Sequence, residues 1–263
     1  MLIAHINNTS IHYRTDGPRR LPCLVLSNSL GTDLRMWDAQ ADALARHFHV
    51  LRYDTRGHGQ SASPPGPYSL EQLGGDVLAL LDHLGIERAH FCGLSMGGVT
   101  GQWLAVHAPA RIDRLVLANT AARVGTADGW QSRAAAVRES GMGAVADSAA
   151  SRWFTGAYVE RHPESVARMV ESLREQNAQG YASCCDALAA ADLRGTLGAV
   201  LAPTLIIAGE HDPVTTLAHA QAMQEEIREA TVLALPASHI SNIEAPTEFT
   251  QAVLEFLLSP GAI

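Results

Sequence analysis

The stretch around Ser95 constrains the fold of this chain more than any other part of the sequence. A strand-like run at 90–92 is followed by Gly-Leu-Ser-Met-Gly at 93–97 and then by a helical pattern that opens with glycine. This order predicts a buried strand, a tight turn and a helix, with the serine at the tip of the turn and its hydroxyl exposed. Gly93 and Gly97 fit the prediction, because a side chain at either position would collide with the neighbouring strand or helix.

The same turn predicts a site for negative charge. N–H groups in the first turn of a helix have no intrahelical partner, so the N–H of Met96 is free to bind a developing oxyanion. The pattern G-x-S-x-G is not specific by itself, because glycine and serine are common residues. A strand before it, a helix after it, and a matching acid and histidine downstream distinguish a catalytic turn from an ordinary glycine-rich one.

Strand-like and helical segments alternate along most of the chain. Residues 2–6 and 11–14 are expected to form an antiparallel hairpin. Strands that alternate with helices over short connections predict an α/β fold with a mostly parallel, doubly wound sheet flanked by helices. Further strands are expected at 24–27, 50–53, 90–92, 115–119, 204–208 and 231–235, and helices at 36–48, 69–84, 99–107, 215–227 and 248–258.

Residues 121–195 interrupt this alternation. The segment is rich in alanine, contains eight arginines and has no strand-like run. We therefore predict a helical cap inserted into an α/β core, whose two parts are residues 1–120 and 196–263. The glycines at 141, 143 and 180 are expected to separate the cap helices.

Composition excludes several classes of function. The net charge is −8 and no basic stretch is present, so nucleic-acid binding is not expected. All 19 basic residues are arginine, so Schiff-base lysine chemistry is excluded, and an anionic substrate must be met by arginine, histidine or backbone donors. The four cysteines form no C-x-x-C pair, so neither a zinc site nor a disulfide framework is expected.

The sequence also bears on localisation. No apolar run reaches the ~18 residues that a membrane span needs, and the first residues do not resemble a signal peptide. A cytoplasmic protein without membrane contact is expected, as a monomer or a homo-oligomer.

Three polar residues follow predicted strands in the order Ser95, Asp212, His239. That is the order expected when a serine nucleophile occupies such a turn. The imidazole would remove the serine proton, and the carboxylate would fix the tautomer of the histidine and stabilise its cation. Glu210 is an alternative acid. Among the twelve histidines, His211 is disfavoured because it adjoins Asp212, and His58, in a Gly-His-Gly turn, is interpreted as structural.

The loop after the strand at 24–27 is expected to supply a second oxyanion donor. Its sequence is Asn-Ser-Leu-Gly at 28–31, and by position the donor is the N–H of Leu30. Loss of one such donor typically raises the barrier by ~3 kcal/mol.

These motifs resemble the α/β-hydrolase family over essentially the whole chain. The resemblance rests on the 93–98 turn, on Asp-Thr-Arg-Gly-His-Gly-Gln-Ser at 54–61, on Gly-Glu-His-Asp at 209–212 and on His239. Within that family the chain is most similar to the bacterial enol-lactonases of 3-oxoadipate, through residues 27–33, 152–154, 180–188 and 191–194. One departure is Asn28-Ser29, where many members of the broader family have His-Gly. That substitution keeps the backbone donor and is expected to change the polar lining.

The resemblance implies hydrolysis of a small anionic lactone through an acyl-enzyme, without a cofactor. The substrate carboxylate would need a counter-charge or several hydrogen-bond donors, for which the cap is the natural source. Trp153 could cover the lactone ring, and Trp130 and Arg133 would share one helix face. The alternatives are packing roles for the tryptophans and a solvated Arg133.

Two other functions are compatible with the motifs. One is a different serine hydrolase, such as a carboxylesterase, a carbon–carbon hydrolase or a perhydrolase, because substrate choice depends on the cap. The other is a binding protein on the same scaffold that does not turn over substrate. Dehalogenases and epoxide hydrolases of this family use aspartate as nucleophile, whereas this chain has Ser95.

Overall fold

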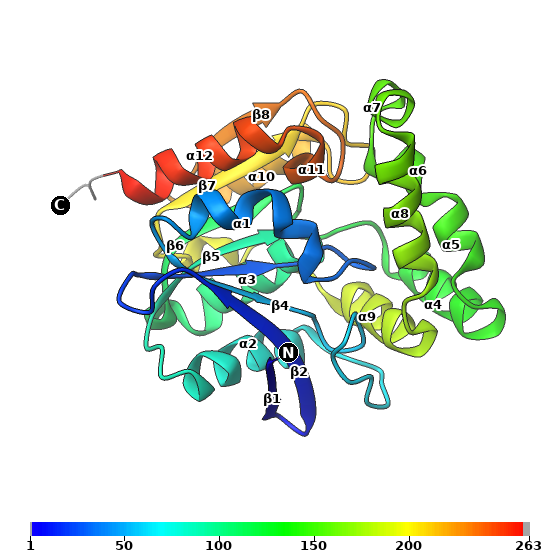
Figure 1. The fold of residues 1–263 in the computed structure, drawn as a ribbon, viewed down its shortest axis with the longest axis horizontal. Coiled ribbons are helices and arrows are strands. Elements are labelled where there is room, and N and C mark those ends of the chain that lie inside the picture. Colours follow the sequence, from blue (N-terminus) through cyan, green and yellow to red (C-terminus); the bar gives the residue numbers. More distant parts are fainter. Residues whose placement is uncertain (1, 260–263) are drawn as a thin grey trace.

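A central sheet organises the part of the chain that the computed structural model describes, residues 2–259. The sheet has eight strands in the order β1-β2-β4-β3-β5-β6-β7-β8. Figure 1 shows it between layers of helices, with a further group of helices on one side. The strands are β1 (Leu2–Ile6), β2 (Thr9–Asp16), β3 (Cys23–Ser27), β4 (His49–Tyr53), β5 (Ala89–Leu94), β6 (Ile112–Ala118), β7 (Thr204–Gly209) and β8 (Thr231–Leu235).

The pairing of the strands confirms the mostly parallel sheet. β1 pairs with β2, and β2 with β4, in antiparallel fashion. From β4 through β3 to β8 every neighbouring pair is parallel. Strands β3, β4, β5 and β6 are largely apolar and buried, as expected for strands covered on both faces. Their carboxyl ends meet at one edge of the sheet, where the loops that carry the candidate catalytic residues begin.

Helices of the core pack against both faces of the sheet. α2 starts with a capping box, in which the Ser69 hydroxyl accepts the Gln72 N–H and the Gln72 side chain accepts the Ser69 N–H. The core helices are η1 (Leu34–Trp37), α1 (Asp38–Leu44), α2 (Leu70–His83), α3 (Met96–His107), η2 (Pro109–Arg111), α10 (Leu217–Glu226), α11 (Ser241–Glu244) and α12 (Pro246–Leu258).

One core helix is shorter than expected. The periodicity predicted a continuous helix over 36–48, but α1 ends at Leu44. The N–H groups of His47 and Phe48 both bond to the Leu44 carbonyl, which turns the chain. Phe48 is thereby buried in the core, and the N–H of His49 pairs with the Pro22 carbonyl as β4 begins. Phe48 fits the helical spacing of apolar residues in the sequence, but in the structure it is a buried residue of a turn.

Helices α4 to α9 lie between β6 and β7, and we call this group the cap. In Figure 1 they gather on one side of the sheet. Gly141, with φ of 75°, ends the first of them. The cap comprises α4 (Ala127–Ser140), α5 (Gly143–Asp147), α6 (Ala149–Trp153), α7 (Gly156–Arg161), α8 (Pro163–Arg174) and α9 (Ala178–Ala190), and η3 (Leu197–Ala199) follows before β7.

Gly180 does not separate two helices, contrary to the sequence prediction. It lies inside α9, whose N-cap is Asn177. The backbone of Gly57 comes so close that a Cβ on Gly180 would lie 2.8 Å from the Gly57 carbonyl carbon. The glycine is there because the cap backbone touches the core backbone at this point.

Residues 2–259 offer neither a membrane-spanning helix nor a cluster of metal ligands. Within 2–259, no helix is both long and apolar enough to cross a bilayer. No cluster of three or more histidine, cysteine, aspartate or glutamate side chains in that range has the arrangement of a metal site.

Candidate active site

Ser95 occupies the tip of the turn between β5 and α3. Its φ of 56° and ψ of −114° are outside the regions that residues other than glycine favour. The N–H of Ser95 bonds to the Ala118 carbonyl at 2.9 Å, which ties the turn to the end of β6. A Cβ on Gly93 would lie 2.7 Å from the Gly98 nitrogen, and one on Gly97 would overlap the Ser27 carbonyl. The structure thus bears out the reason given for both glycines.

Two backbone N–H groups beside Ser95 are free to bind a substrate oxygen. Neither the N–H of Leu30 nor that of Met96 has a protein acceptor among the described residues. The carbonyl of Ser29 accepts the N–H and the hydroxyl of Thr32, at 3.2 and 2.8 Å. Because a trans peptide is planar, the N–H of Leu30 points the opposite way. The N–H of Gly97 donates to the Asn28 carbonyl at 3.0 Å, so this loop and the serine turn are held together.

Of the two residues in the Asn28-Ser29 departure, Ser29 contributes to the lining of the site and Asn28 does not. The side chain of Asn28 is fully buried and faces the core. Its amide donates to the Tyr53 carbonyl at 2.7 Å, and its oxygen accepts the Trp37 indole N–H at 2.9 Å. Ser29, the next residue, is the one that lines the cavity beside Ser95.

Asp212 is a buried carboxylate that lies against His239. His239 Nδ1 and Asp212 Oδ2 are 2.8 Å apart. Oδ1 accepts the N–H groups of Val214 and Thr215, and Oδ2 accepts the Thr215 hydroxyl and the Asn119 amide, all at 2.7 to 3.0 Å. Burial by itself would raise the pKa of Asp212, but the bonds from His239, Thr215 and Asn119 lower it to about 2.

The other candidate acids and bases lie elsewhere. Glu210 is exposed to solvent, whereas Asp212 contacts His239. His211 lines a separate surface depression beside α7. His58 is buried, and its Nε2 accepts the N–H of Gly31 at 2.9 Å. Burial lowers the pKa of His58, so its neutral form holds the loop at 28–31 through Gly31.

Asn119 and Thr215 were missed by the sequence reasoning. Asn119 follows β6 and has a positive φ of 44°. Its oxygen also accepts the Ser241 hydroxyl at 2.5 Å. A polar residue at the end of a buried strand was the available signal, but the pairing with Asp212 joins residues 93 positions apart.

Ser95 and His239 line one small cavity under the cap. Its volume is about 40 Å³, comparable to the share of one water molecule in the liquid. The three side chains that sequence reasoning assigned to the substrate, Trp130, Arg133 and Trp153, line it as well. The remaining lining residues are Ser29, Leu30, Val124, Arg152, Leu173, Tyr181 and Val214.

Two arginines give this cavity a positive charge. The guanidinium of Arg133 stacks on Trp130, with its central carbon 4.8 Å from the ring centroid. Arg152 donates to the carbonyls of Ser148 and Val145, at 3.0 and 2.9 Å. Within residues 2–259 neither guanidinium forms an ion pair with a carboxylate. Burial and the nearby Arg133 lower the pKa of Arg152.

Tyr181 adds no balancing negative charge. Its hydroxyl group lies near the two arginines, which favour the ionised form. Burial nevertheless dominates and raises the pKa of Tyr181 to about 12. The side chain is therefore neutral at pH 7, and the cavity keeps a surplus of positive charge in a protein whose net charge is −8.

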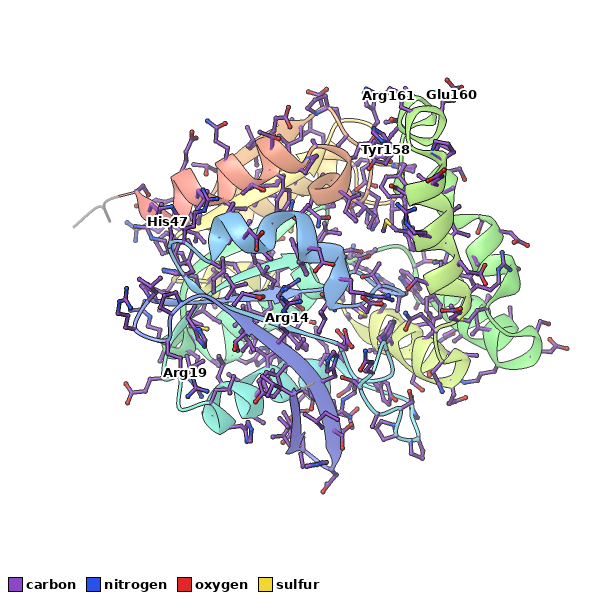
Figure 2. The ribbon with its side chains drawn as sticks, in the orientation of Figure 1. Arg14, Arg19, His47, Tyr158, Glu160 and Arg161 are labelled. Carbon is purple, nitrogen blue, oxygen red and sulfur yellow. The ribbon has the colours of Figure 1, made fainter. Side chains whose placement is uncertain are left out.

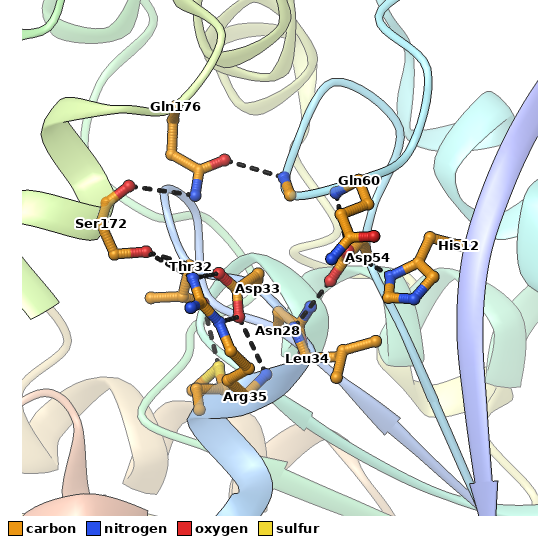
Figure 3. A network of polar contacts seen from close by, with 12 residues as sticks. His12, Asn28, Thr32, Asp33, Leu34, Arg35, Asp54, Gln60, Ser172 and Gln176 are labelled. Carbon is orange, nitrogen blue, oxygen red and sulfur yellow. Dashed lines mark hydrogen bonds and ion pairs between the residues drawn. The ribbon is translucent and has the colours of Figure 1, made fainter. Parts of the chain in front are cut away.

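Asp54, from the 54–61 motif, supports the loop that contains Leu30. As Figure 3 shows, its carboxylate lies among donors from three segments. Oδ1 accepts the N–H of Leu34 at 2.8 Å, while Oδ2 accepts the N–H of Gln60 at 2.9 Å and lies 2.8 Å from His12 Nδ1. This motif therefore supports the loop that contains Leu30, and none of its residues lines the cavity.

Comparisons with known proteins agree with this fold. The sequence profile of the alpha/beta hydrolase fold family matches residues 22–246. The chain is 51% identical over 246 residues to 3-oxoadipate enol-lactonase 2 of Acinetobacter baylyi, covering 94% of this chain and 92% of that protein. It is 43% identical over 259 residues to 3-oxoadipate enol-lactonase 1 of the same organism, covering 98% and 97%.

A solved structure agrees as well. The enol-lactonase from Burkholderia xenovorans superposes with a TM-score of 0.96 at 50% identity, over 97% of this chain and 99% of that one. The matched profile, the mostly parallel sheet and the serine turn all lead to the same assignment: this chain belongs to the alpha/beta hydrolase fold family.

Proposed function

We propose that this protein is a serine hydrolase that opens the enol-lactone of 3-oxoadipate to 3-oxoadipate. One observation carries the proposal beyond a general esterase: the cavity that contains Ser95 and His239 also contains Arg133 and Arg152, without a carboxylate to pair them. A lactone with a carboxymethyl group supplies the missing charge. The names of the relatives in Acinetobacter and Burkholderia support the same substrate.

In the proposed reaction, Ser95 attacks the lactone carbonyl while His239 takes its proton. The oxyanion is bound by the N–H groups of Leu30 and Met96, and Asp212 stabilises the histidine cation. The ring C–O bond breaks, and the enolate that leaves remains attached to the acyl-enzyme. His239 returns the proton to it, and the enol tautomerises to the ketone. Water activated by His239 then hydrolyses the ester and releases 3-oxoadipate. No metal or organic cofactor takes part.

The cap would select the substrate. A carboxylate between Arg133 and Arg152 would replace water as the partner of two guanidinium groups, each suited to paired hydrogen bonds. Trp130 holds Arg133 through stacking, and Trp153 would cover the lactone ring. We assign the reaction to the β-ketoadipate route of aromatic breakdown, in the cytoplasm.

The test is the loss of the ultraviolet absorbance of the enol-lactone with purified protein, beside Ser95→Ala and beside a neutral aryl ester. The expected result is fast, Ser95-dependent loss of the enol-lactone and weak action on the aryl ester. The reverse preference would make the protein a general carboxylesterase. Labelling of Ser95 by a fluorophosphonate without turnover of either ester would favour a binding protein.

A further inference from the structure

The two residues that flank His239 are both held from outside their own loop. The N–H of Ser238 donates to Glu244 Oε2 at 2.8 Å. The N–H of Ile240 donates to the carbonyl of Trp153, the last residue of α6, at 3.0 Å. The backbone on either side of His239 is therefore fixed by one bond to α11 and one bond to the cap.

Glu244 also binds the cap directly. Its carboxylate accepts the Thr155 N–H, at 3.2 and 3.3 Å to its two oxygens, and Oε1 accepts the Thr155 hydroxyl. Thr155 is the N-cap of α7. Glu244 itself is fixed, because its N–H bonds to the Ile240 carbonyl at 3.1 Å. One carboxylate thus joins the start of a cap helix to the loop of His239.

A second contact lies beside this joint. Tyr158 points from α7 toward the core, while Glu160 and Arg161 point outward, as Figure 2 shows. The Tyr158 hydroxyl donates to the Ile243 carbonyl at 3.3 Å. The cap therefore meets α11 along the first turn of α7, and Glu244 is the charged group at that meeting point.

We propose that Glu244 is a positioning residue that makes the alignment of His239 depend on the contact between the cap and the segment 240–244. The inference deepens the proposed function and rests on its assignment of His239 as the base. When the cap is seated, Trp153 and Thr155 hold Ile240 and, through Glu244, Ser238. When that part of the cap lifts, the bond from Ile240 to Trp153 and the bonds from Thr155 to Glu244 are lost. Only the bond from Ser238 to Glu244 remains, its carboxylate no longer held by Thr155, and the imidazole loses its fixed position.

The chemistry of the joint requires a carboxylate. An ionised carboxylate only accepts hydrogen bonds, and here its two oxygens receive three donors. A glutamine of the same length would turn one oxygen into an NH₂ group that faces another N–H. Such a change breaks the hydrogen bonds of Glu244 with little change in side-chain volume. A small displacement of a catalytic group can lower the reaction rate by a large factor.

The experiment compares Glu244→Gln with Glu248→Gln. Glu248 is an exposed glutamate in the first turn of α12, so its substitution removes the same charge nearby. For Glu244→Gln we expect kcat to fall about tenfold or more with KM changed less than about threefold, and the low-field NMR signal of the His239 Nδ1 proton to broaden. Glu248→Gln should match wild type. A folded Glu244→Gln variant whose kcat is within twofold of the wild-type value would overturn the proposal.

Thr155 provides the second arm. Thr155→Val removes the hydroxyl donor and Thr155→Ser keeps it, so kcat should fall in the first variant and return in the second. If Glu244→Gln fails to fold, the two Thr155 variants serve as the test. Equal kcat values for Thr155→Val and wild type would then refute the proposed role of Glu244. A fall in kcat that only tracks the unfolded fraction, measured by circular dichroism, also refutes it.

Failure of the proposed function is separable from failure of this inference. The same variants are assayed for the rate at which a fluorophosphonate labels Ser95, which needs His239 but no lactone. If the wild-type protein does not hydrolyse the enol-lactone, the substrate assignment is wrong. The labelling rates of Glu244→Gln and Thr155→Val would still support or refute the joint.

Discussion

Asp212 illustrates how single residues keep the site ready for chemistry. Its carboxylate has no solvent exposure, yet bonds from both sides keep it ionised, and its pKa lies near 2. In the proposed mechanism an ionised Asp212 fixes the tautomer of His239, so that the other ring nitrogen can accept a proton. The same bonds also stabilise the fold.

The free energy of unfolding should therefore depend on the charge of Asp212 in acid. Its pKa is lowered from 3.8 to about 2 in the folded protein, so the unfolded state binds the proton more readily. The stabilisation is full above pH 5 and is lost as the pH falls through 4 toward 2, by about 2 kcal/mol in all. Urea unfolding followed by tryptophan fluorescence should show this loss in wild type.

The control for that measurement is Asp212→Asn, which cannot titrate. Relative to Asp212→Asn, wild type should by pH 3 have lost about half of the total of about 2 kcal/mol in its free energy of unfolding. If both proteins lose stability in parallel from pH 6 to pH 3, the donors around Asp212 do not lower its pKa.

Arg133 should determine preference for an anionic substrate. Arg133→Gln removes one of the two guanidinium charges in the cavity, so KM for the enol-lactone should rise about tenfold or more, while a neutral aryl ester is unaffected. Arg138→Gln is the matched control, since Arg138 lies on the same helix but pairs with Asp186. An equal effect of Arg133→Gln on both substrates would show that it acts through packing against Trp130.

At the scale of elements, the serine turn and the oxyanion loop form one unit. Gly97 lies against the carbonyl of Ser27, and a Cβ there would be 2.9 Å from the Asn28 oxygen. Backbone cannot yield as a flexible side chain can, so Gly97→Ala must separate the two elements. The N–H groups of Leu30 and Met96, which we propose as the oxyanion donors, would then move apart.

Gly97→Ala should destabilise the protein by about 2 kcal/mol or more and abolish turnover of the enol-lactone. Gly75→Ala is the control: Gly75 lies inside α2, and a Cβ there meets only Asn7 Nδ2 at 3.7 Å. Alanine is the better helix former, so this variant should gain up to about 1 kcal/mol. Thermal melts of both variants test these two expectations. An active and stable Gly97→Ala variant would contradict the close approach of Gly97 to the backbone of Ser27 and Asn28.

The elements around Ser95 could be predicted because their signals are local. A strand, a glycine turn and a helix follow one another within twenty residues, and Ser95, Asp212 and His239 each follow a strand. The partners of Asp212 and the joint at Glu244 could not be read in the same way. They depend on which strand ends and helix ends become neighbours, and Thr155 meets Glu244 across 89 positions. Gly180 likewise marks a contact with Gly57, not a break in its own helix.

At the scale of the whole molecule, the cap is attached in two different ways. Helices α4 and α9 pack together, and α9 touches the core through backbone at Gly57 and Gly180 and through a 3.2 Å bond from Tyr68 N–H to the Ser183 carbonyl. The end of α8 is held by side chains instead. Ser172 meets Asp33 and Arg35, and Gln176, just beyond α8, accepts the Gly59 N–H at 2.9 Å, as Figure 3 shows.

The cavity beside Ser95 is too small for a lactone, so we expect part of the cap to move when substrate binds. Its 40 Å³ is far below the roughly 300–1,000 Å³ of pockets that hold small ligands. A cleft of about 440 Å³ also lies against α8, lined by Gly31, Met169 and Ser172 among others. Leu173 and Leu30 line the inner cavity next to these residues. Displacement of α8 would join the two spaces and admit a substrate.

Hydrogen exchange should show this division of the cap. Amides of α8 should exchange faster than those of α9, because side-chain bonds near the surface open more readily than close-packed backbone. Phosphonylation of Ser95 would fill the cavity and should slow exchange in α8 if the seated cap closes over the adduct. Mass spectrometry of peptic peptides from free and phosphonylated protein measures both effects. Equal protection of α8 and α9 in the free protein would mean that substrate reaches Ser95 by another path.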